Sequence, residues 1–488
     1  MVPRFDNTYA RLPERFFSRV APAPVPAPSL VVLNEPLASE LGFDPARLRE
    51  PDGVQLLAGN AVPEGAASLA MAYAGHQFGN WVPQLGDGRA VLLGEVIDRH
   101  GARRDVQWKG AGRTPYSRGG DGRAVLGPCL REYLVSEAMT ALGIPSTRGL
   151  AVVLTGDRVM REGSKPGAVF TRVAASHVRI GTFEFFANRN DLPAVRTLAD
   201  YVIERHYPGC AAEGNPHLAL LQAIIARTAA LVAHWQAVGF IHGVMNTDNM
   251  SVAGETIDYG PCAFMDHYDP ATVFSSIDTQ GRYAYGNQPR IAQWNLARLA
   301  LALLPLLASD QEQAIGLAQA ALSDFIAQFE AAYRRLMLAK IGLEDAGDTP
   351  SLLVQELLGL MTAQRPDMTL TFRSLLAAAG PGDGDALLRA QFTDPAPLLP
   401  WLARWRLELE HQGAEAGIAR MRAHNPAFIP RNHRLEQAIL AAESSGDLAP
   451  FEELHAALSR PYEDQPRFEP LARPPRPEEV VPATFCGT

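Results

Sequence analysis

The stretch that decides the fold of this chain is Ile241-His242-Gly243-Val244-Met245-Asn246-Thr247-Asp248-Asn249-Met250, and it is followed shortly by Asp258-Tyr259-Gly260. Asn249 offers an amide oxygen and Asp258 offers a carboxylate. Hard oxygen ligands of this kind suit Mg²⁺, which keeps several waters and shares phosphate oxygens with the protein. The two motifs therefore predict a metal site at one end of a nucleotide pocket.

The spacing in this stretch is similar to that of the catalytic loop of protein kinases. In those loops a His-x-Asp sequence carries the base, and an Asn five residues beyond the Asp binds a metal. Here His242 and Asn249 keep the spacing, but Val244 stands at the base position and cannot accept a proton. An acid returns as Asp248, directly before the Asn. The chain is either an inactive phosphotransferase or an enzyme that uses the same parts for a different nucleotide reaction.

The composition is that of a soluble globular protein. The chain has 488 residues, of which 47% are hydrophobic and 20% are charged, and this length predicts two or three packed units. The formal charge is 44 − 53 = −9. Such an acidic balance argues against general nucleic-acid binding, although it leaves room for a locally basic nucleotide pocket.

Cysteine usage and apolar segments indicate a cytoplasmic protein with no membrane partner. The four cysteines form no CxxC pair and no secreted-type spacing, which favours a reducing compartment. The Pro/Ala run at 20–28 is not a signal peptide. The longest apolar run, 299–308, contains Pro and is too short to span a bilayer, so we expect a buried helix. Nothing predicts oligomerisation, and we expect a monomer.

Hydrophobic periodicity predicts an α+β fold with a β-rich part followed by a large helical part. The segment 255–257 is similar to the strand that precedes a kinase metal turn, and nearly everything beyond residue 290 is expected to be helical. The other expected elements are strands at 90–96, 105–108, 151–154 and 168–173, an amphipathic helix at 128–142, and helices at 192–205 and 218–238. This order is the plan of the bilobal protein-kinase-like fold, a likeness that does not by itself assign chemistry.

The same pattern divides the chain into five parts. Residues 1–65 are Pro-rich and irregular and are expected to wrap the core as an N-terminal extension. Residues 66–175 are expected to form an N-lobe with nucleotide-binding loops, and residues 176–310 a C-lobe with the catalytic loop and metal turn. A helical extension is expected over 311–470, and an extended tail over 471–488.

Lys109 and Glu132 are candidates for a pair that holds nucleotide phosphates. Lys109 ends a strand-like run, and Glu132 lies on the helix that follows. A lysine at a strand end is usually exposed, and a charge on a helix usually faces solvent. Lys on a strand, Glu on the next helix, and then Asn249 and Asp258 form a four-part order that chance rarely gives.

Glycines and arginines around these residues suit a polyphosphate. The turn Gly86-Asp87-Gly88-Arg89 can lay backbone N–H groups against phosphate, although an isolated turn of this kind is a weak signal. The segment 110–123, with three arginines and five glycines, predicts a flexible basic loop. Arg172 and Arg179 lie at and after a strand, where a buried arginine needs an anionic partner.

Long motifs between residues 70 and 300 resemble the selenoprotein O (SelO/YdiU) family of kinase-like protein adenylyltransferases, and weaker similarity extends to both ends. Motifs of this length are far more specific than a generic kinase pattern. The segments that carry the resemblance are Tyr73-Ala74-Gly75-His76-Gln77-Phe78-Gly79, Gln84-Leu85-Gly86-Asp87-Gly88-Arg89-Ala90, Lys109-Gly110-Ala111-Gly112-Arg113-Thr114-Pro115-Tyr116-Ser117-Arg118, His242 to Met250, Asp258-Tyr259-Gly260-Pro261, Gly281-Arg282-Tyr283 and Asn287-Gln288-Pro289.

The resemblance implies a changed use of the pocket. In this family ATP is bound flipped relative to ordinary kinases, so that AMP is transferred to a protein Ser, Thr or Tyr hydroxyl and pyrophosphate leaves. Mg²⁺ or Mn²⁺ is the implied cofactor, ATP the co-substrate, and proteins with acceptor hydroxyls the partners. An arginine-rich pocket suits a pyrophosphate leaving group, and a base moved from position 244 to Asp248 suits attack at a different phosphorus.

The resemblance also implies roles for individual residues. Asp248 would accept the hydroxyl proton, and Asn249 and Asp258 would bind the metal. Glu132 would orient Lys109. The residues implied to hold the nucleotide are Gly86, Gly88, Arg89, Lys109, Asp121, Gly122, Arg172, Arg179 and Asp258.

A redox role for the tail is a further implication of the resemblance. Family members often carry a reactive Cys or selenocysteine near the C-terminus, which a disulfide can join to the activation segment. Here Cys486 supplies the tail thiol, but the activation segment 272–276 contains no cysteine. Cys262 is the candidate partner, and an unpaired tail thiol is the alternative.

Two other functions compete with adenylylation. A conventional kinase would phosphorylate a protein or a small molecule, but Val244 at the base position argues against it. A nucleotide-binding scaffold would have no need of the metal pair Asn249 and Asp258. Transfer of UMP from UTP stays open, because no residue pattern here identifies the base.

Overall fold

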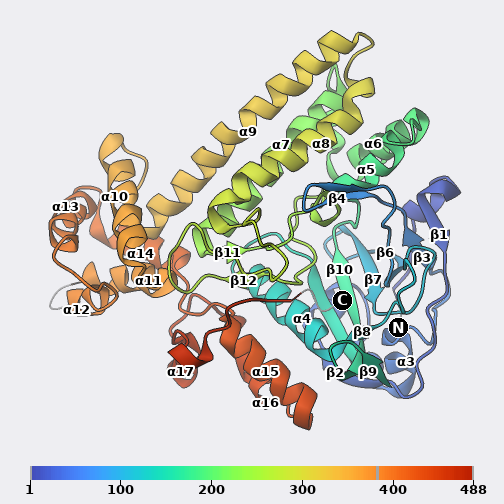
Figure 1. Ribbon diagram of the computed structural model, residues 1–488, viewed down its shortest axis with the longest axis horizontal. Helices are drawn as coiled ribbons and strands as arrows, with labels where there is room; N and C mark the ends of the chain where they lie inside the picture. Colours follow the sequence, from blue (N-terminus) through green and yellow to red (C-terminus); the bar gives the residue numbers. More distant parts are fainter. Residues whose placement is uncertain (1–2, 381–383, 486–488) are drawn as a thin grey trace.

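The computed structural model describes residues 3–380 and 384–485 and shows a mixed α/β protein with one β-sheet region and many helices. In Figure 1 the sheet lies on one side of the molecule, and the helices between residues 348 and 424 lie on the opposite side. The long helices of the middle of the chain connect the two. The predicted strand-then-helix order is confirmed at this level.

Eight strands form the main sheet, and every neighbouring pair is antiparallel. Their bounds are β1 (Phe17–Arg19), β2 (Ser29–Leu33), β3 (Leu69–Met71), β6 (Ala90–Ile97), β7 (Arg103–Lys109), β8 (Ala124–Val125), β9 (Arg148–Met160) and β10 (Ser164–Ala174). The order is β1-β3-β6-β7-β10-β9-β2, with β8 beside β10. Two small hairpins are separate from this sheet: β4 (Gly75–Gln77) with β5 (Asn80–Val82), and β11 (Phe240–Ile241) with β12 (Ala263–Phe264).

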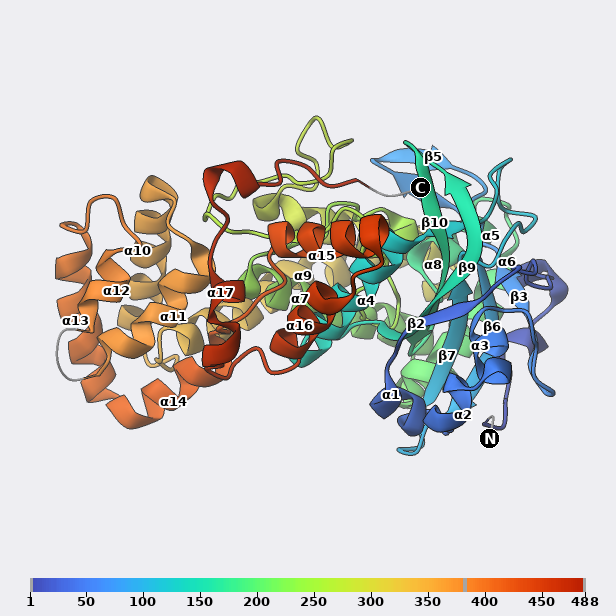
Figure 2. The ribbon, with the colours of Figure 1, turned by 90° about the horizontal axis from the view of Figure 1, so that it is seen from below.

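Helices make up most of the remainder of the described chain. The α-helices are α1 (Glu35–Glu40), α2 (Pro45–Arg49), α3 (Pro51–Leu57), α4 (Leu126–Ala141), α5 (Ile180–Ala187), α6 (Leu192–His206), α7 (Pro216–Val238), α8 (Gln288–Leu307), α9 (Gln311–Lys340), α10 (Asp348–Gln364), α11 (Met368–Ala378), α12 (Asp385–Arg389), α13 (Leu398–His411), α14 (Ala414–His424), α15 (Asn432–Ser445), α16 (Ala449–Leu458) and α17 (Glu469–Ala472). Helices α10 to α14 gather at the end of the molecule far from the sheet (Figure 2).

The strands and helices expected from periodicity are confirmed as β6, β7, β9, β10, α4, α6 and α7. β9 and β10 run well beyond the expected ranges because a long hairpin with exposed residues near its turn continues the ladder past the core. The segment 255–257 was expected to be a strand, and this expectation is wrong. Thr256 forms only an isolated bridge with Ser146, since β11 pairs with β12 instead.

The expectation that residues 1–65 are irregular is also wrong. β1 and β2 occupy the two edges of the main sheet, and α1 to α3 follow them. The run Ser29–Leu33 is rich in β-branched and aliphatic residues, which suit an edge strand between Pro-rich segments. The Pro-rich connection is itself bonded to the sheet region, because the amide of Ala23 donates to the carbonyl of Ala111 at 2.8 Å.

Helix α4 is buried on both faces and is not the amphipathic surface helix that its pattern predicts. One face packs on β9 and β10, and α15 and α16 cover the other (Figure 2). As a result Arg131 and Glu132 are both buried. Arg131 faces α15, where its guanidinium donates to Asn432 and Glu436, whereas Glu132 faces Lys109 and Arg172. The local sequence alone does not indicate these partners.

Helix α7 is the one described helix that is long and apolar enough to cross a membrane by length and composition alone. It packs against α8 and α9, and most of its apolar side chains are buried in the main core. This is the packing of a core helix. The apolar run 299–308 lies in the last turns of α8, where Leu299, Leu303 and Leu307 are buried as expected.

Candidate active site

Two backbone segments that were predicted to carry the metal ligands lie side by side. Phe240 of β11 pairs with Phe264 of β12, and the loop after β11 runs back past the segment before Asp258. The ring of His242 is buried, and its Nε2 lies 3.0 Å from the carbonyl oxygen of Ile257. His242 therefore connects the loop 242–250 to the turn at Asp258 through the Ile257 carbonyl. Val244, at the position of a kinase base, is buried and apolar.

Three cations converge on the carboxylate of Asp258. Arg172 Nη1 donates to its Oδ1 at 2.6 Å, and Arg179 Nη1 donates to its Oδ2 at 2.6 Å. Lys109 Nζ lies 3.5 Å from Oδ1. Burial alone would raise the pKa of Asp258, but the charges of Arg172, Arg179 and Lys109 hold this pKa well below its ordinary value. The backbone of Asp258 has φ of 64°, a left-handed conformation that non-glycine residues seldom adopt.

The sheet register explains why these cations meet. Arg172 of β10 pairs directly with Gln107 of β7, and Lys109 lies two residues further along the same strand, so Lys109 and Gln107 share a face. Arg172 Nη2 donates to Gln107 Oε1 at 2.7 Å. Glu132 completes the group from α4, since it forms an ion pair with Lys109 and accepts from Arg172 Nη1 at 3.1 Å. The expected Lys109–Glu132 pair is therefore present.

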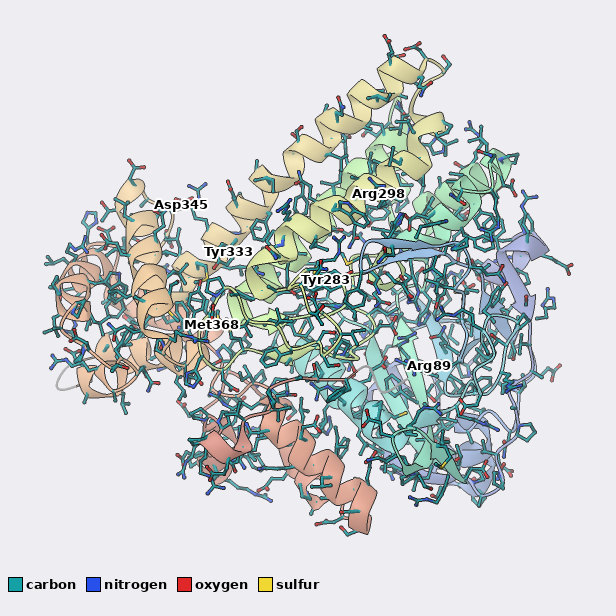
Figure 3. The ribbon with its side chains drawn as sticks, viewed as in Figure 1. Arg89, Tyr283, Arg298, Tyr333, Asp345 and Met368 are labelled. Atoms are coloured by element: carbon teal, nitrogen blue, oxygen red, sulfur yellow. The ribbon has the colours of Figure 1, made fainter. Side chains whose placement is uncertain are left out.

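The sequence-predicted residues lie around one cavity of about 470 Å³. Glu132 does not line this cavity, but its carboxylate contacts Lys109, which does. The predicted residues that line the cavity are Gly86, Gly88, Arg89, Lys109, Asp121, Gly122, Arg172, Arg179, Asp248, Asn249 and Asp258. In Figure 3 Arg89 lies on the side of the molecule that holds the main sheet, and Tyr283 lies on the side of the loop 242–250.

The glycine turn is shaped by close packing. Gly86 has φ of 76°, and a Cβ there would lie 2.3 Å from the ring of Tyr116. A Cβ on Gly88 would lie 2.8 Å from the carbonyl oxygen of Tyr116. Between them the buried carboxylate of Asp87 accepts from the amide of Met71 at 3.0 Å. The turn is thus fixed with its backbone along the cavity wall.

The loop 110–123 was expected to be flexible, but the structure anchors it at several points. The amide of Gly112 donates to the carbonyl of Gly122 at 3.0 Å, and Asp121 forms an ion pair with Arg161 at 2.8 Å. Arg123 Nη2 donates to the carbonyl of Pro24 at 2.9 Å. These bonds give the glycine-rich segment a defined path along the cavity, because one closes the loop on itself and two attach its side chains to residues outside it.

Asp248 lies in a 3₁₀ turn, Thr247–Asn249, and lines the cavity. It is only 6% exposed, and burial raises the pKa of its carboxyl to about 6. One carboxylate oxygen, Oδ2, lies 3.3 Å from Gln77 Nε2, and the other has no hydrogen-bond partner among the described residues. The backbone carbonyl of Asp248 accepts from Arg179 Nη1 at 2.6 Å.

The donor set fits a hard divalent cation that shares phosphate oxygens. Asn249 Nδ2 donates to the carbonyl of Val244 at 3.0 Å, which leaves its amide oxygen available as a ligand. Asn249 and Asp258 line the same cavity. The described residues contain no group of three His, Cys, Asp or Glu side chains that could hold a metal alone. One amide and one carboxylate suit Mg²⁺ only when phosphates and waters complete the shell.

Three residues of the site had no role in the sequence prediction. Gln107 accepts a hydrogen bond from Arg172, and Gln77 donates one to Asp248. The ring of Tyr73 lies under the Arg179 guanidinium, 4.7 Å from its carbon. Tyr73 and Gln77 belong to the motif 73–79 that carries part of the family resemblance, so the signal was present without a function attached to it.

The predicted partner of the tail thiol is close to the tail. Cys486 lies outside the described residues. Cys262 is free and buried, and burial raises the pKa of its thiol to about 12. The hydroxyl of Thr484 donates to the carbonyl of Pro261 at 2.5 Å, and its amide donates to the carbonyl of Phe274 at 2.7 Å. The segment before Cys486 therefore contacts the residue before Cys262.

Comparison with known proteins agrees with this geometry. The family model for protein adenylyltransferase SelO matches residues 2–459. A protein nucleotidyltransferase YdiU from Bradyrhizobium sp. (strain BTAi1) is 62% identical over 488 residues, and one from Rhodopseudomonas palustris (strain BisB18) is 61% identical over 486 residues. Each alignment covers 99% of both chains. The chain therefore belongs to the SelO family of protein adenylyltransferases, and it is an enzyme of the nucleotidyltransferase class.

Proposed function

We propose that this enzyme transfers AMP from ATP to Ser, Thr or Tyr hydroxyls of protein substrates. The hydroxyl oxygen forms a bond to the α-phosphorus, the bond between that phosphorus and the bridging oxygen breaks, and pyrophosphate leaves. The observation that carries the proposal is the cluster of Lys109, Arg172 and Arg179 around Asp258, in a cavity that Asp248 also lines. Group transfer to such a site depends on positioning and on neutralising charge.

The cations favour a nucleotide bound with its phosphates inward. Lys109, Arg172 and Arg179 would hold the β- and γ-phosphates, together with the loop at Asp121 and Gly122. An adenine ring would gain little from these charges, whereas a pyrophosphate leaving group is stabilised by them. This supports the flipped orientation of ATP. Gly86, Gly88 and Arg89 would line the rest of the nucleotide site, and Glu132 would orient Lys109.

Asp248 is the proposed proton acceptor. Its buried carboxylate lines the cavity, where a bound acceptor hydroxyl could reach it, and Val244 cannot serve. Asn249 and Asp258 would hold Mg²⁺ or Mn²⁺, which would neutralise phosphate charge when bound. In this proposal the Asp258 carboxylate would contact the divalent metal ion as well as the side chains of Lys109, Arg172 and Arg179.

The site fits a bilobal, kinase-like division of the chain. We propose that residues 66–175 act as the N-lobe and 176–310 as the C-lobe, since Lys109 of the first part and Asp258 of the second meet in an ion pair at the cavity. The extensions would be 1–65, 311–470 and 471–488. We also propose a monomer that works in the cytoplasm, in keeping with the free thiols of the described cysteines.

Separately labelled nucleotides test the proposal. The protein is incubated with a mixed protein acceptor pool and ATP labelled at the α- or the γ-phosphate. Protein-bound label from the α-position alone is expected, and it should fall to a low residual rate in Asp248→Asn. Label from the γ-position alone would show a kinase and overturn the proposal. The relatives are named nucleotidyltransferases without a base, so α-labelled UTP is tested beside ATP to decide which nucleotide is used.

A further inference from the structure

The hairpin of β4 and β5 is bonded to the catalytic loop. The amide of His76 donates to the Thr247 hydroxyl at 2.7 Å, and the amide of Phe78 donates to the side-chain oxygen of Asn246 at 2.9 Å. Both receiving side chains are buried. Tyr283 also donates to the same oxygen of Asn246 at 2.7 Å. The hairpin therefore forms a lid on the two residues that precede Asp248.

The residue between these two contacts reaches Asp248 itself. Gln77 Nε2 lies 3.3 Å from Asp248 Oδ2, and among the described residues it is the side-chain donor on this carboxylate. Gly75 lies against the same side chain, because a Cβ there would be 2.4 Å from Asp248 Oδ1. Its φ is not positive, so packing against Asp248 is what favours glycine at this position.

Helix α5 fixes the other side of the hairpin (Figure 1). The amide of Ala74 donates to the carbonyl of Gly181 at 3.0 Å, and a Cβ on Gly181 would lie 2.1 Å from the Ala74 carbonyl oxygen. His76 Nδ1 lies 2.7 Å from Glu184 Oε1. The hairpin is thus held between α5 and the catalytic loop, and Gln77 has a fixed base from which to contact Asp248.

We infer that Gln77 is a positioning residue for the reaction: its amide holds the Asp248 carboxylate in the orientation that receives the acceptor proton. The inference rests on the proposed role of Asp248. A hydrogen bond from a neutral amide keeps the carboxylate in one rotamer without neutralising it. Loss of that bond lets the carboxylate turn, while the nucleotide, which is held by other residues, binds as before.

Two substitutions separate positioning from mere packing. Gln77→Glu keeps the size of the side chain but replaces the donor by a second carboxylate, and Gln77→Leu removes the polar group. Both are expected to lower kcat at least about tenfold with the KM for ATP unchanged within about twofold. Gln355→Leu, at an exposed position in α10, is the matched control and should keep wild-type kinetics. Melting temperatures are measured for every variant.

A double-mutant cycle with Asp248→Asn completes the test. If Gln77 acts through Asp248, adding Gln77→Leu to Asp248→Asn causes no further loss of the residual rate beyond about twofold. Wild-type kcat in Gln77→Glu, or equal losses in both backgrounds, would overturn the inference. Failure of the proposed function looks different, since the wild type would then transfer no α-label. Failure of the proposed role of Asp248 alone would appear as α-label transfer by Asp248→Asn at the wild-type rate, whatever residue stands at position 77.

Discussion

The guanidinium of Arg172 donates to the carboxylate of Asp258 at 2.6 Å while Arg172 is only 1% exposed. This bond joins β10 of the main sheet to the turn that follows the catalytic loop. A buried arginine without an anionic partner is costly, so Asp258 stabilises the cation cluster in the absence of nucleotide. When phosphates enter the cavity, they can take over part of this role.

Asp258→Asn is expected to abolish transfer and to destabilise the nucleotide-free protein. Lys109, Arg172 and Arg179 lose their shared anion, and breaking a buried pair of this kind costs about 3–5 kcal/mol. Adding pyrophosphate should raise the melting temperature of the variant more than that of the wild type. Thermal unfolding with and without pyrophosphate measures this. Asp52→Asn, at an exposed position in α3, is the control, and an equal response of wild type and variant would contradict the prediction.

Glu132→Gln is expected to weaken productive nucleotide binding. Glu132 is paired with both Lys109 and Arg172, and without its charge the two cations are no longer held apart and oriented. We expect kcat/KM for ATP to fall about tenfold, which corresponds to a loss of about 1.4 kcal/mol. Steady-state kinetics over a range of ATP concentrations give the value. Glu410→Gln, exposed on α13, should show wild-type kinetics.

Gly86→Ala is expected to disrupt the nucleotide turn. The new Cβ would meet the ring of Tyr116, in addition to the strain of a positive φ. Gly101→Ala is a matched control, since Gly101 has φ of 82° but open space around its Cβ position. The control should lose only about 1 kcal/mol of stability. Nucleotide affinity, measured by calorimetry, should fall at least about tenfold in Gly86→Ala alone, and equal affinities in both variants would exclude a role for the clash.

The buried amine of Lys340, which does not line the active-site cavity, is expected to make the free energy of unfolding depend on pH. Burial lowers the pKa of Lys340 to about 7, whereas in the unfolded chain it is about 10.4. The unfolded state therefore binds more protons between these values, so the stability of the wild type rises as the pH rises through this window. Lys340→Met removes the buried charge together with its hydrogen bond to the His424 carbonyl.

We expect Lys340→Met to be about 1–3 kcal/mol more stable than the wild type near pH 7. The excess should shrink steadily as the pH rises from 7 towards 10.4, because the amine is already neutral in the folded wild type while the unfolded chain gives up its proton only near pH 10.4. Denaturant unfolding of the two proteins at several pH values gives the difference. A difference that stays constant between pH 7 and 10 would show that the amine is not titrating in the folded protein.

Oxidation is expected to lower transfer activity through a bond between Cys486 and Cys262. The contact of Thr484 with Pro261 brings the segment before Cys486 towards Cys262. Peptide mapping of the oxidised protein should detect the linked pair, and activity should return on reduction. If oxidation still lowers the activity of Cys486→Ser, the predicted bond between Cys486 and Cys262 is not the cause of the loss, and the prediction is wrong.

The sequence by itself determined the order of the elements and the identity of the groups on the cavity. Local periodicity places Lys109 at the end of a strand, and the spacing of Asn249 and Asp258 follows from one loop and one turn. These are short-range properties, so the local pattern is enough to indicate them. The local pattern fails at the segment 255–257, whose sequence is similar to a strand although no neighbouring strand in the described part of the chain pairs with it.

Only the tertiary structure decided how distant segments complete the site. Residues near position 20 form sheet edges, α15 contacts the buried Arg131, and the hairpin at Gln77 covers Asp248. Each of these depends on contacts between segments far apart in the chain. Such contacts arise from the packing of whole surfaces, and no local pattern records which surfaces will meet.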